Sequence, residues 1–402
     1  MSKVLVLNAG SSSLKYQVID MKTEEALVKG LCERIGIDGG VITHKYNGKK
    51  VVTNIEMKDH TAALEFVLKS IVDKEIGCVK SLDEISAVGH RVLHGGETFT
   101  KAVKIDDKVI SQIEELIPLG PLHQPANLQG IYACKKLMPN VPQVAVFDTA
   151  FHSTMKPKAF RYAIPNEDYT EYHIRKYGFH GTSHKYVSQK MAEYFGRKGK
   201  FVVLHIGNGA SLSAVSGGVC QDTSMGYTPL DGCMMGTRSG SVDASILPTL
   251  CEKHGFDVNG AINYLNKKSG LYGLTGFSDG RDVENASKNA NGAYTTEQVN
   301  NARLAEDMRA YIDAKIVASY VVPLGGLDAI AFTAGVGEND YLYRQRVVNY
   351  LAGFGIEIDE EKNSKRGVEG EISTEDSDVK VYVIPTNEEL QIAKESIEVL
   401  GL

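Results

Sequence analysis

The chain opens with a pattern that permits few folds, VLVLNAGSSSLKYQVID at residues 4–20. Two apolar, β-branched runs flank a small polar segment at residues 8–13, which predicts a strand, a tight turn and a second strand. Residues 201–215, FVVLHIGNGASLSAV, have the same form about half a chain later. One apolar strand that ends in glycine is common in α/β proteins, whereas two matching hairpins predict two similar domains that face each other.

Size and charge narrow the class of protein. A chain of 402 residues exceeds the length at which a single core usually stops growing, so two domains are expected. A net charge of −6 argues against a nucleic-acid or anionic-membrane surface as partner. The six cysteines form no CxxC pair and no Cys/His ligand spacing, so neither a zinc site nor a disulfide framework is indicated, and a cytoplasmic location is expected. Pro323 and nearby glycines interrupt the longest apolar stretch, residues 316–337, which argues against a membrane span.

Strand patterns alternate with helical ones along the chain. Buried strands that run into functional loops are predicted within residues 85–96, 142–152 and 329–339, and helical spacing covers residues 302–318. This mixture predicts an α/β fold with helices on both faces of its sheets. We expect an N-terminal domain at residues 1–150, completed by the C-terminal helix at 386–402, and a nucleotide-binding domain at residues 151–385.

Three glycine-rich segments have the composition of anion-binding turns. Gly10 and the three serines that follow it can direct backbone N–H groups into one concavity, with Lys15 on the next strand. This segment matches neither the Walker pattern nor a GxGxxG turn, and an ordinary Ser-rich hairpin is the alternative. Residues 205–211 form the second such turn, and residues 333–339 are predicted as a third turn that precedes a helix. Together they predict a nucleotide held between two domains, and Asn8 offers a neutral oxygen for Mg²⁺.

Cationic side chains lie beside glycines or prolines at four places. They are Arg91 in GHRVLHGGE, His123 in PLHQPAN, His180 in YGFHGTSH and Arg238 in MGTRSG. A single Arg at such a place is usually part of a surface ion pair, and a single His is more often structural. Four cations on a chain that also carries anion-binding turns favour a phosphoryl-transfer site.

The chain resembles the acetate kinases, a family of the acetate and sugar kinase, heat-shock chaperone and actin superfamily. The motifs that carry the resemblance run in order from NAGSSSLKY through GHRVLHGGE, DTAFH, YGFHGTSH, LHIGNGAS, DTSMGYTPLDG and MMGTRSG to PTNEEL. The resemblance implies an α/β fold of two duplicated ribonuclease-H-like (actin-like ATPase) domains with a central cleft. It also implies a homodimer that transfers the ATP γ-phosphoryl to acetate by direct in-line transfer, giving acetyl phosphate and ADP, with Mg²⁺ or, in its place, Mn²⁺.

The resemblance also implies roles for residues at matching positions. Asp148, His180 and Arg238 would be catalytic, and Asn8 and Glu388 would serve the metal. Substrate binding would use Arg91, Leu93, Leu122, His123, Phe179 and Pro229, of which the apolar four would form a methyl pocket. The nucleotide would contact Lys15, His205, Ile206, Gly207, Asn208, Gly209, Asp279, Gly280, Arg281, Gly335, Val336, Gly337, Glu338 and Asn339.

The chemistry of the reaction agrees with this inventory. A carboxylate substrate is already ionised at neutral pH, so no general base is required, and the difficulty is repulsion between two anions. Asp148 is therefore interpreted as a group that orients Mg²⁺-bound water or an arginine. Five positions depart from the family pattern: Leu93 stands where Val is common, Gln124 where Asn is usual, Asp231 where Glu is usual, Ala244 where Pro is frequent, and Ala334 where Gly is usual. Propionate or butyrate kinase activity, and a non-kinase actin-like ATPase, remain the alternatives.

Overall fold

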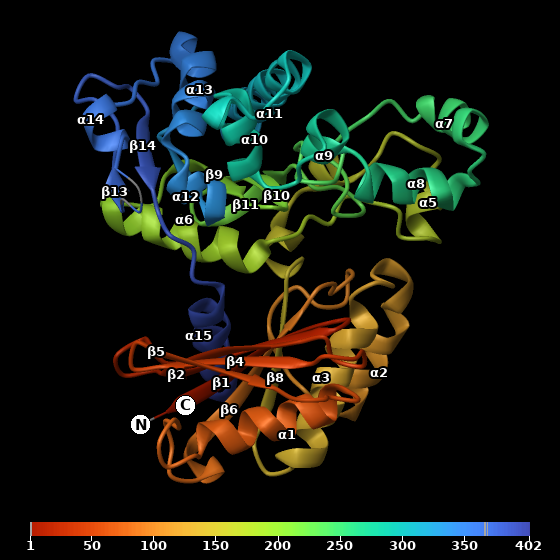
Figure 1. The fold of residues 1–402 in the computed structure, drawn as a ribbon, viewed down its shortest axis with the longest axis vertical. Helices are drawn as coiled ribbons and strands as arrows, with labels where there is room; N and C mark the ends of the chain where they lie inside the picture. Colours follow the sequence, from red (N-terminus) through yellow and green to blue (C-terminus); the bar gives the residue numbers. More distant parts are fainter. Residues whose placement is uncertain (1, 366, 368) are drawn as a thin grey trace. The chain divides into compact units, whose positions relative to one another are not determined.

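The computed structural model describes residues 2–365, 367 and 369–402, and the chain divides into two compact units. Unit 1 comprises residues 1–153 and 387–402, and unit 2 comprises residues 154–386. Each unit contains one sheet, and both sheets carry α-helices (Figure 1). Among the described residues, no helix combines the length and the apolar character that crossing a membrane requires.

Unit 1 is built on an eight-stranded sheet with the order β5-β4-β3-β2-β1-β6-β8-β7. Strands β1, β6 and β8 are parallel to one another, whereas the remaining neighbours pair antiparallel. The strands are β1 (Lys3–Gly10), β2 (Ser13–Asp20), β3 (Glu25–Glu33), β4 (Val41–Tyr46), β5 (Lys49–Asn54), β6 (Ile85–Val92), β7 (Val103–Lys104) and β8 (Gln143–Phe147). The α-helices are α1 (His60–Ile71), α2 (Asp107–Glu115), α3 (Gln124–Leu137) and α15 (Glu388–Leu400).

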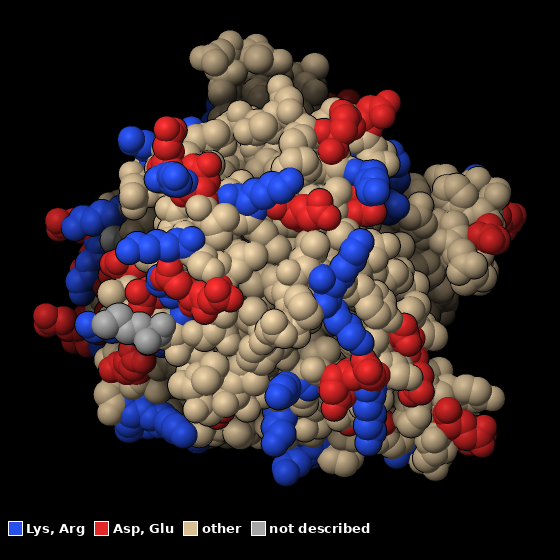
Figure 2. All heavy atoms as spheres, turned by 90° about the horizontal axis from the view of Figure 1, so that it is seen from below, with Lys and Arg blue, Asp and Glu red and all other residues tan. Residues whose placement is uncertain are grey.

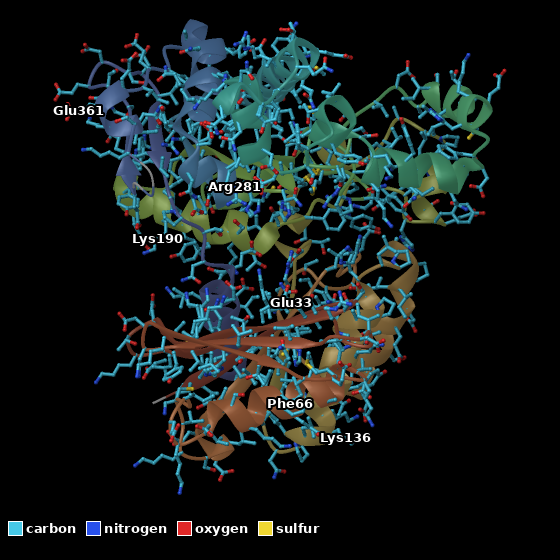
Figure 3. All side chains as sticks on the ribbon, in the orientation of Figure 1. Glu33, Phe66, Lys136, Lys190, Arg281 and Glu361 are labelled. Atoms are coloured by element: carbon cyan, nitrogen blue, oxygen red, sulfur yellow. The ribbon has the colours of Figure 1, made fainter. Side chains whose placement is uncertain are left out.

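Helices cover both faces of the first sheet. On one face, Leu5 and Leu7 of β1 join a buried cluster with residues of α1 and α3, and Phe66 of α1 packs against its edge (Figure 3). On the other face lies α15, which approaches so closely that a Cβ atom on Gly89 would come within 2.7 Å of Ile392. The alternation of side chains along β1 therefore places Asn8 on the α15 face.

Unit 2 is built on a six-stranded sheet with the order β11-β10-β9-β12-β14-β13. Strands β9, β12 and β14 are parallel, and the other neighbours pair antiparallel. The strands are β9 (Lys200–Ile206), β10 (Ala210–Ser216), β11 (Val219–Thr223), β12 (Ala329–Thr333), β13 (Gly370–Glu371) and β14 (Lys380–Val383). The α-helices are α4 (Pro157–Phe160), α5 (Asn166–Thr170), α6 (Gly181–Phe195), α7 (Ile246–His254), α8 (Val258–Lys267), α9 (Gly270–Thr275), α10 (Gly280–Ser287), α11 (Thr296–Leu324), α12 (Ala334–Asn339), α13 (Tyr341–Leu351) and α14 (Glu360–Asn363).

The fold class predicted from the sequence is confirmed. Both hairpins form as expected, β1 with β2 and β9 with β10, and a two-residue turn joins Gly10 to Ser13. The predicted helix at residues 302–318 lies within α11, which starts with a capping box at Thr295 and Gln298. The sheets share the order β3-β2-β1-β6-β8-β7 and β11-β10-β9-β12-β14-β13, so the two units are duplicates in topology.

One local prediction is wrong. Residues 333–339 were expected to form a turn before a helix, but Ala334–Asn339 are themselves the helix α12. Glycine disfavours helix, so the pattern alone points away from this result. Side-chain hydrogen bonds stabilise the helix: within it, Glu338 accepts from the Ala334 N–H at 2.8 Å, and the buried Arg344 of the next helix donates to the carbonyl groups of Gly337 and Glu338 at 2.9 and 3.0 Å.

Surface charge is mixed on the face that Figure 2 shows, where Lys and Arg alternate with Asp and Glu. Lys136 on α3, which Figure 3 labels, is exposed. That face carries no block of one sign, in agreement with the net charge of −6.

Candidate functional site

In unit 1, an arginine and an aspartate form a two-pronged ion pair at the carboxyl ends of β6 and β8. Arg91 donates from Nε to Asp148 Oδ1 at 2.9 Å and from Nη2 to Oδ2 at 2.6 Å. The Asp148 side chain is 1% exposed and that of Arg91 is 25% exposed. Asp148 raises the pKa of the guanidinium, and Glu388 adds to the effect against the opposing effect of burial. Arg91 is therefore a fixed cation, and its Nη1 donates no hydrogen bond within the described part of the chain.

Glu388, the first residue of α15, brings a carboxylate to the same edge of the first sheet. Burial raises the pKa of Glu388, whereas the nearby Arg91 and Lys15 lower it. Asn8 and Lys15 are directly opposite each other in the β1–β2 ladder, so their side chains share one face of the sheet. The register and the electrostatic partners together gather these predicted residues at one end of unit 1.

The segment after β6 is held in place by two buried amides. Asn127 of α3 accepts from the Leu93 N–H at 3.0 Å and donates to the Ala9 carbonyl at 2.8 Å. Gln124 accepts from the His94 N–H at 3.2 Å and donates to the His94 carbonyl at 3.0 Å. Sequence reasoning gave neither amide a role, although the motif PLHQPAN contains both. Leu93 is half-buried, whereas Leu122 is 73% exposed and His123 is exposed as well.

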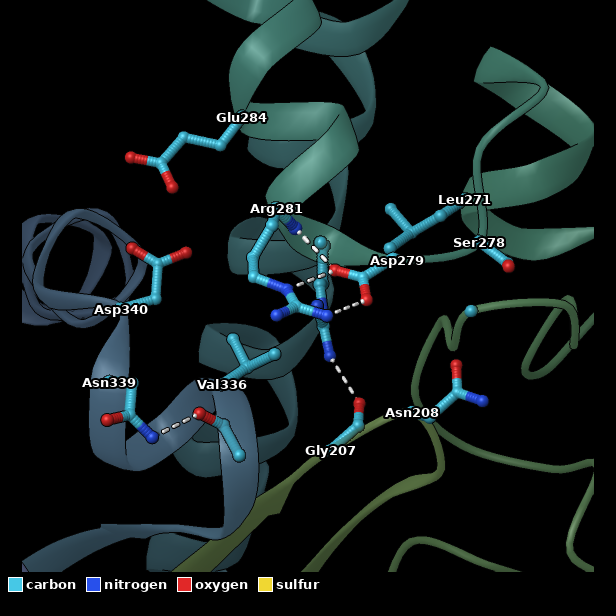
Figure 4. A pocket seen from close by; sticks show the side chains of 14 residues that line it. Gly207, Asn208, Leu271, Ser278, Asp279, Arg281, Glu284, Val336, Asn339 and Asp340 are labelled. Carbon is cyan, nitrogen blue, oxygen red and sulfur yellow. Dashed lines mark hydrogen bonds and ion pairs between the residues drawn. The ribbon is translucent and has the colours of Figure 1, made fainter. Parts of the chain in front are cut away.

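Unit 2 contains a cavity of about 620 Å³ that several separate segments line (Figure 4). Its floor is the turn after β9, and its sides are the starts of α10 and α12. The lining residues are Gly207, Asn208, Gly236, Leu271, Ser278, Asp279, Gly280, Arg281, Glu284, Arg309, Gly335, Val336, Asn339 and Asp340. A cavity of this size with glycines at its edge accepts a drug-sized or nucleotide-sized ligand.

Eight of the predicted nucleotide residues line this cavity: Gly207, Asn208, Asp279, Gly280, Arg281, Gly335, Val336 and Asn339. Five other predicted residues of unit 2, His205, Ile206, Gly209, Gly337 and Glu338, are not among its lining residues. Glu338 accepts hydrogen bonds from the backbone N–H groups of Ala334 and Thr386, at 2.8 and 3.1 Å. Its place in the structure is therefore between α12 and the segment after β14.

Sequence reasoning missed six lining residues: Gly236, Leu271, Ser278, Glu284, Arg309 and Asp340. Arg309 is buried and donates from Nη2 to the Gly207 carbonyl at 3.0 Å, drawn in Figure 4 as the dashed line that ends at Gly207. Position 236 has no room for a larger side chain, because a Cβ atom there would lie 2.1 Å from Asn208 Oδ1. The sequence around Arg309 contains no motif that would indicate a binding role. Gly236, in contrast, is the first glycine of the motif MMGTRSG.

The first turn of α10 carries an exposed ion pair. Asp279 accepts from Arg281 Nε at 3.0 Å and Nη2 at 2.7 Å, and from the Arg281 N–H at 2.8 Å (Figure 4). The Arg281 hydrogen bonds lower the pKa of Asp279 to about 2. Side-chain exposures of 85% for Arg281 and 43% for Asp279 leave both groups accessible to a ligand.

A second cluster in unit 2 surrounds the start of α6. His180 precedes the helix with a positive φ of 57°, and its ring stacks on that of His205 at a centroid distance of 4.3 Å. Ser211 Oγ lies 2.9 Å from His180 Nδ1 and 2.7 Å from His184 Nε2. A Cβ on Gly209 would lie 3.5 Å from both His180 Nε2 and Arg238 Nη2, so this glycine leaves open the space where the two donors approach each other.

Arg238 is a half-buried cation without a carboxylate partner in the described structure. Its Nη1 donates to the Pro229 carbonyl at 2.8 Å, and burial lowers the pKa of the guanidinium. Pro229 is half-buried, and Phe179, which precedes His180, is buried. A guanidinium that is partly desolvated and has no fixed anion has donors to offer to an anionic ligand.

The donor set of unit 1 is suited to magnesium. No three His, Cys, Asp or Glu side chains in the described ranges cluster so as to hold a metal ion by themselves. Mg²⁺ at phosphoryl-transfer sites is usually bound by one or two carboxylates together with waters and substrate phosphates. Asn8 and Glu388 present hard oxygen atoms of this kind, so these two residues fit a Mg²⁺ ion.

Comparison with known proteins identifies relatives over the whole length. The model of the acetokinase family matches residues 3–394. The acetate kinase of Caldanaerobacter subterraneus subsp. tengcongensis is 54% identical over 399 residues, which is 98% of either chain. The acetate kinase of Treponema denticola is 52% identical over 400 residues, covering 98% of this chain and 99% of its own.

Solved structures agree in both fold and sequence. The acetate kinase of Porphyromonas gingivalis superposes with a TM-score of 0.94 at 45% identity over the full length of both chains. A propionate kinase from Francisella tularensis superposes with a TM-score of 0.92 at 42% identity, covering 99% of this chain and all of its own. The resemblance inferred from the ordered motifs is confirmed by these matches, and the chain belongs to the acetokinase family.

Proposed function

We propose that the chain is an acetate kinase, a phosphotransferase that moves the γ-phosphoryl of ATP reversibly to the carboxylate of acetate and gives acetyl phosphate and ADP. The observation that carries the proposal is Arg238, a half-buried guanidinium that lies beside His180 without a carboxylate partner in the described structure. Membership of the acetokinase family supplies the reaction class.

Arg91 is proposed to bind the carboxylate of acetate. Its Nε and Nη2 are committed to Asp148, which leaves Nη1 for a second anion. Acetate is ionised at neutral pH and is already a nucleophile, so Asp148 has no proton to remove. Its role in this proposal is to fix the orientation of the guanidinium, which the bidentate geometry at 2.9 and 2.6 Å supports.

His180 and Arg238 are proposed to stabilise the transition state. During in-line transfer, negative charge spreads over the equatorial oxygens of the phosphoryl, and preorganised donors lower the barrier most. Two donor side chains lie next to Gly209, where a Cβ would contact both at 3.5 Å. The phosphoryl would occupy the space that the absent Cβ leaves.

The cavity of unit 2 is proposed to hold the nucleotide. Backbone groups of Gly207 and Gly335 line it, and the Asp279–Arg281 pair stands at its edge. Lys15 would contact the phosphates from unit 1. Asn8 and Glu388 would hold Mg²⁺, or Mn²⁺ in its place, and the bound ion supplies neutralisation of phosphate charge. Glu388→Gln should therefore raise the Mg²⁺ concentration that half-maximal activity requires.

The acyl specificity of the chain has a second candidate in the same family. A propionate kinase is among its close structural relatives, and Leu93, Leu122, Phe179 and Pro229 are proposed to border the methyl group. Leu93 is half-buried, and Asn127 holds its backbone by accepting a hydrogen bond from the Leu93 N–H. A leucine at this place favours acetate over longer acids because an extra methylene of substrate would meet it.

Hydroxylamine trapping of acyl phosphate tests the proposal directly. Purified protein with ATP and Mg²⁺ is supplied with acetate, propionate or butyrate in parallel, and a reaction without carboxylate is the control. We expect acyl hydroxamate to form fastest with acetate and ATP turnover to require the acid. Turnover that is independent of any carboxylate would instead support an actin-like ATPase.

We also propose that the protein acts as a homodimer in the cytoplasm. Unit 2 exposes several apolar side chains, Ile164, Tyr172, Val242 and Val258 among them, which a second copy would cover. Sedimentation equilibrium tests the oligomeric state, and a monomer at micromolar concentration would contradict it.

A further inference from the structure

We propose that Ser211 sets the ring orientation and the tautomer of His180, and so acts as a positioning residue for the phosphoryl transfer. This inference rests on the proposed function, in which His180 donates to the transferring phosphoryl. Ser211 belongs to β10 and is fully buried, and sequence reasoning gave it no role, although it ends the motif LHIGNGAS.

The geometry around Ser211 permits few arrangements of protons. Its Oγ lies within hydrogen-bond distance of two imidazoles, 2.9 Å from His180 Nδ1 and 2.7 Å from His184 Nε2. A serine hydroxyl has a single proton and can donate it to only one of the two rings. A neutral imidazole has one donor nitrogen and one acceptor nitrogen. The ring to which Ser211 donates its proton therefore determines which nitrogen of each neutral ring is protonated.

One of these arrangements serves the transfer. If His184 Nε2–H donates to Ser211 Oγ and the hydroxyl donates to His180 Nδ1, the His180 proton lies on Nε2. That nitrogen is the one placed with Arg238 Nη2 around the open space at Gly209, each 3.5 Å from the point that a Cβ on Gly209 would occupy. The opposite arrangement would place a lone pair there and repel an anionic oxygen.

The backbone and the neighbouring rings hold His180 for this role. Its φ of 57° lies in the left-handed region, which is sterically unfavourable for a non-glycine residue. The stacked His205 ring restricts rotation, and His205 Nδ1 is itself tied to Ser183 Oγ at 2.7 Å. Ser211 and His205 are direct partners in the β9–β10 ladder, so one hairpin supplies both restraints.

The tautomer of His180 in the wild-type protein is the decisive measurement. Long-range ¹H–¹⁵N spectra of protein labelled at its 11 histidines, with His180→Gln used only to assign the signal, report which ring nitrogen carries the proton. We expect a neutral ring with the proton on Nε2 and with Nδ1 as acceptor. A proton on Nδ1 would overturn the proposal, and this result does not depend on any variant of Ser211.

Kinetics supply the second test, with a matched control on the same strand. Ser213 lies two residues further along β10, is equally buried, and donates to Thr223 Oγ1 at 3.1 Å, away from the histidines. We expect Ser211→Ala to lower kcat about ten- to a hundredfold with the KM for ATP nearly unchanged, and Ser211→Thr to restore most of the loss. Ser213→Ala should retain wild-type kcat.

The outcomes separate this inference from the proposed function. If Ser211→Ala folds, as judged by circular dichroism, and keeps the wild-type kcat, Ser211 is not a positioning residue. An equal loss in Ser213→Ala would show a packing effect and would overturn the inference as well. Failure of the wild-type protein to form acetyl phosphate would instead refute the proposed function, while the tautomer measurement would still decide what Ser211 does to His180.

Discussion

The two sheets share a strand order but differ in what stands at the carboxyl ends of their parallel strands. In unit 1, β6 ends with Arg91 and Val92, and Asp148 follows β8. In unit 2 the positions that match in register are apolar, Ala331 for Arg91 and Ile384 for Asp148. The same hydrogen bond defines the match, since the N–H of Asp148 donates to Val92 and that of Ile384 donates to Phe332, both at 3.0 Å.

This difference shows how one strand order can support two kinds of binding site. Unit 1 uses charged side chains fixed by each other, an arrangement that suits a small carboxylate. Unit 2 places glycines and helix starts around a cavity of about 620 Å³, which suits a larger ligand with many polar atoms. Arg238 departs from the contrast, because it is a side-chain cation of unit 2 that is not among the residues lining this cavity.

The largest expected effect is that of replacing Arg238, the residue that departs from the contrast. Arg238→Ala should lower kcat roughly a hundredfold or more while the KM for ATP changes little, because the guanidinium would contact the phosphoryl mainly in the transition state. Steady-state kinetics of acetyl phosphate formation measure both constants. Arg281→Ala, at the edge of the cavity, is the control and should raise the KM for ATP more than it lowers kcat. An unchanged kcat in Arg238→Ala would remove it from the site.

A matched pair of aspartates sharpens the contrast between the units. Asp148 and Asp279 each accept two hydrogen bonds from one arginine side chain, but the Asp148 side chain is 1% exposed and that of Asp279 is 43% exposed. Asp148→Asn should lower kcat/KM for acetate about tenfold or more because Arg91 loses its fixed orientation. Asp279→Asn should leave kcat/KM for acetate nearly unchanged, since exposed ion pairs contribute little.

The pH profile of Asp148→Asn distinguishes orientation from proton transfer. If Asp148 only orients Arg91, the acidic limb of kcat/KM against pH should keep its position in the variant. Loss of that limb would favour a general-base role and would contradict our interpretation of the buried ion pair.

A smaller effect is expected at the proposed acyl pocket around Leu93. The wild-type protein should use propionate with a kcat/KM about tenfold or more below that for acetate, and butyrate less well again, since a methylene in an apolar pocket is worth about 1–3 kcal/mol. Leu93→Ala should raise activity with the longer acids selectively. Leu122→Ala should have a smaller effect than Leu93→Ala, because the Leu122 side chain is 73% exposed. Equal changes with all three acids would refute the pocket assignment.

The smallest effect concerns stability in unit 2. Ala334 has a φ of 64°, a conformation that glycine adopts without steric cost. Ala334→Gly should therefore stabilise the protein by about 1 kcal/mol or less in urea unfolding, with the KM for ATP unchanged because Ala334 does not line the cavity. Ala331→Gly, in the buried strand β12, is the control and should be destabilising. A destabilised Ala334→Gly would show that its methyl group packs usefully.

Local sequence patterns predicted most of the fold. Alternating apolar runs around Gly10 and Gly207 predicted both hairpins, and helical spacing predicted the middle of α11. Helix α12 was missed because its glycines disfavour helix, and the hydrogen bonds that stabilise it come from Arg344 in the next helix. Sequence spacing contains no information on such tertiary hydrogen bonds.

The candidate site was predictable where its residues lie in short motifs. Gly207, Asp279 and Gly335 each belong to a glycine-containing segment, and all three line the cavity. Arg309 and Ser211 were not predicted, because each contacts residues that are distant in the sequence. Arg309 donates to the Gly207 carbonyl, and Ser211 lies within hydrogen-bond distance of two histidines. Such contacts can be identified only from the three-dimensional structure.

Helix α15 has a consequence for how the chain is made. Residues 387–402 complete unit 1, yet they leave the ribosome after all of unit 2. Until they emerge, the strip of the first sheet around Gly89, against which Ile392 packs, has no cover from this helix, and the nascent chain presents apolar strands to chaperones. Any product of interrupted translation that stops before Asn387 lacks both that cover and Glu388. Unit 1 is therefore completed only after unit 2 has been synthesised.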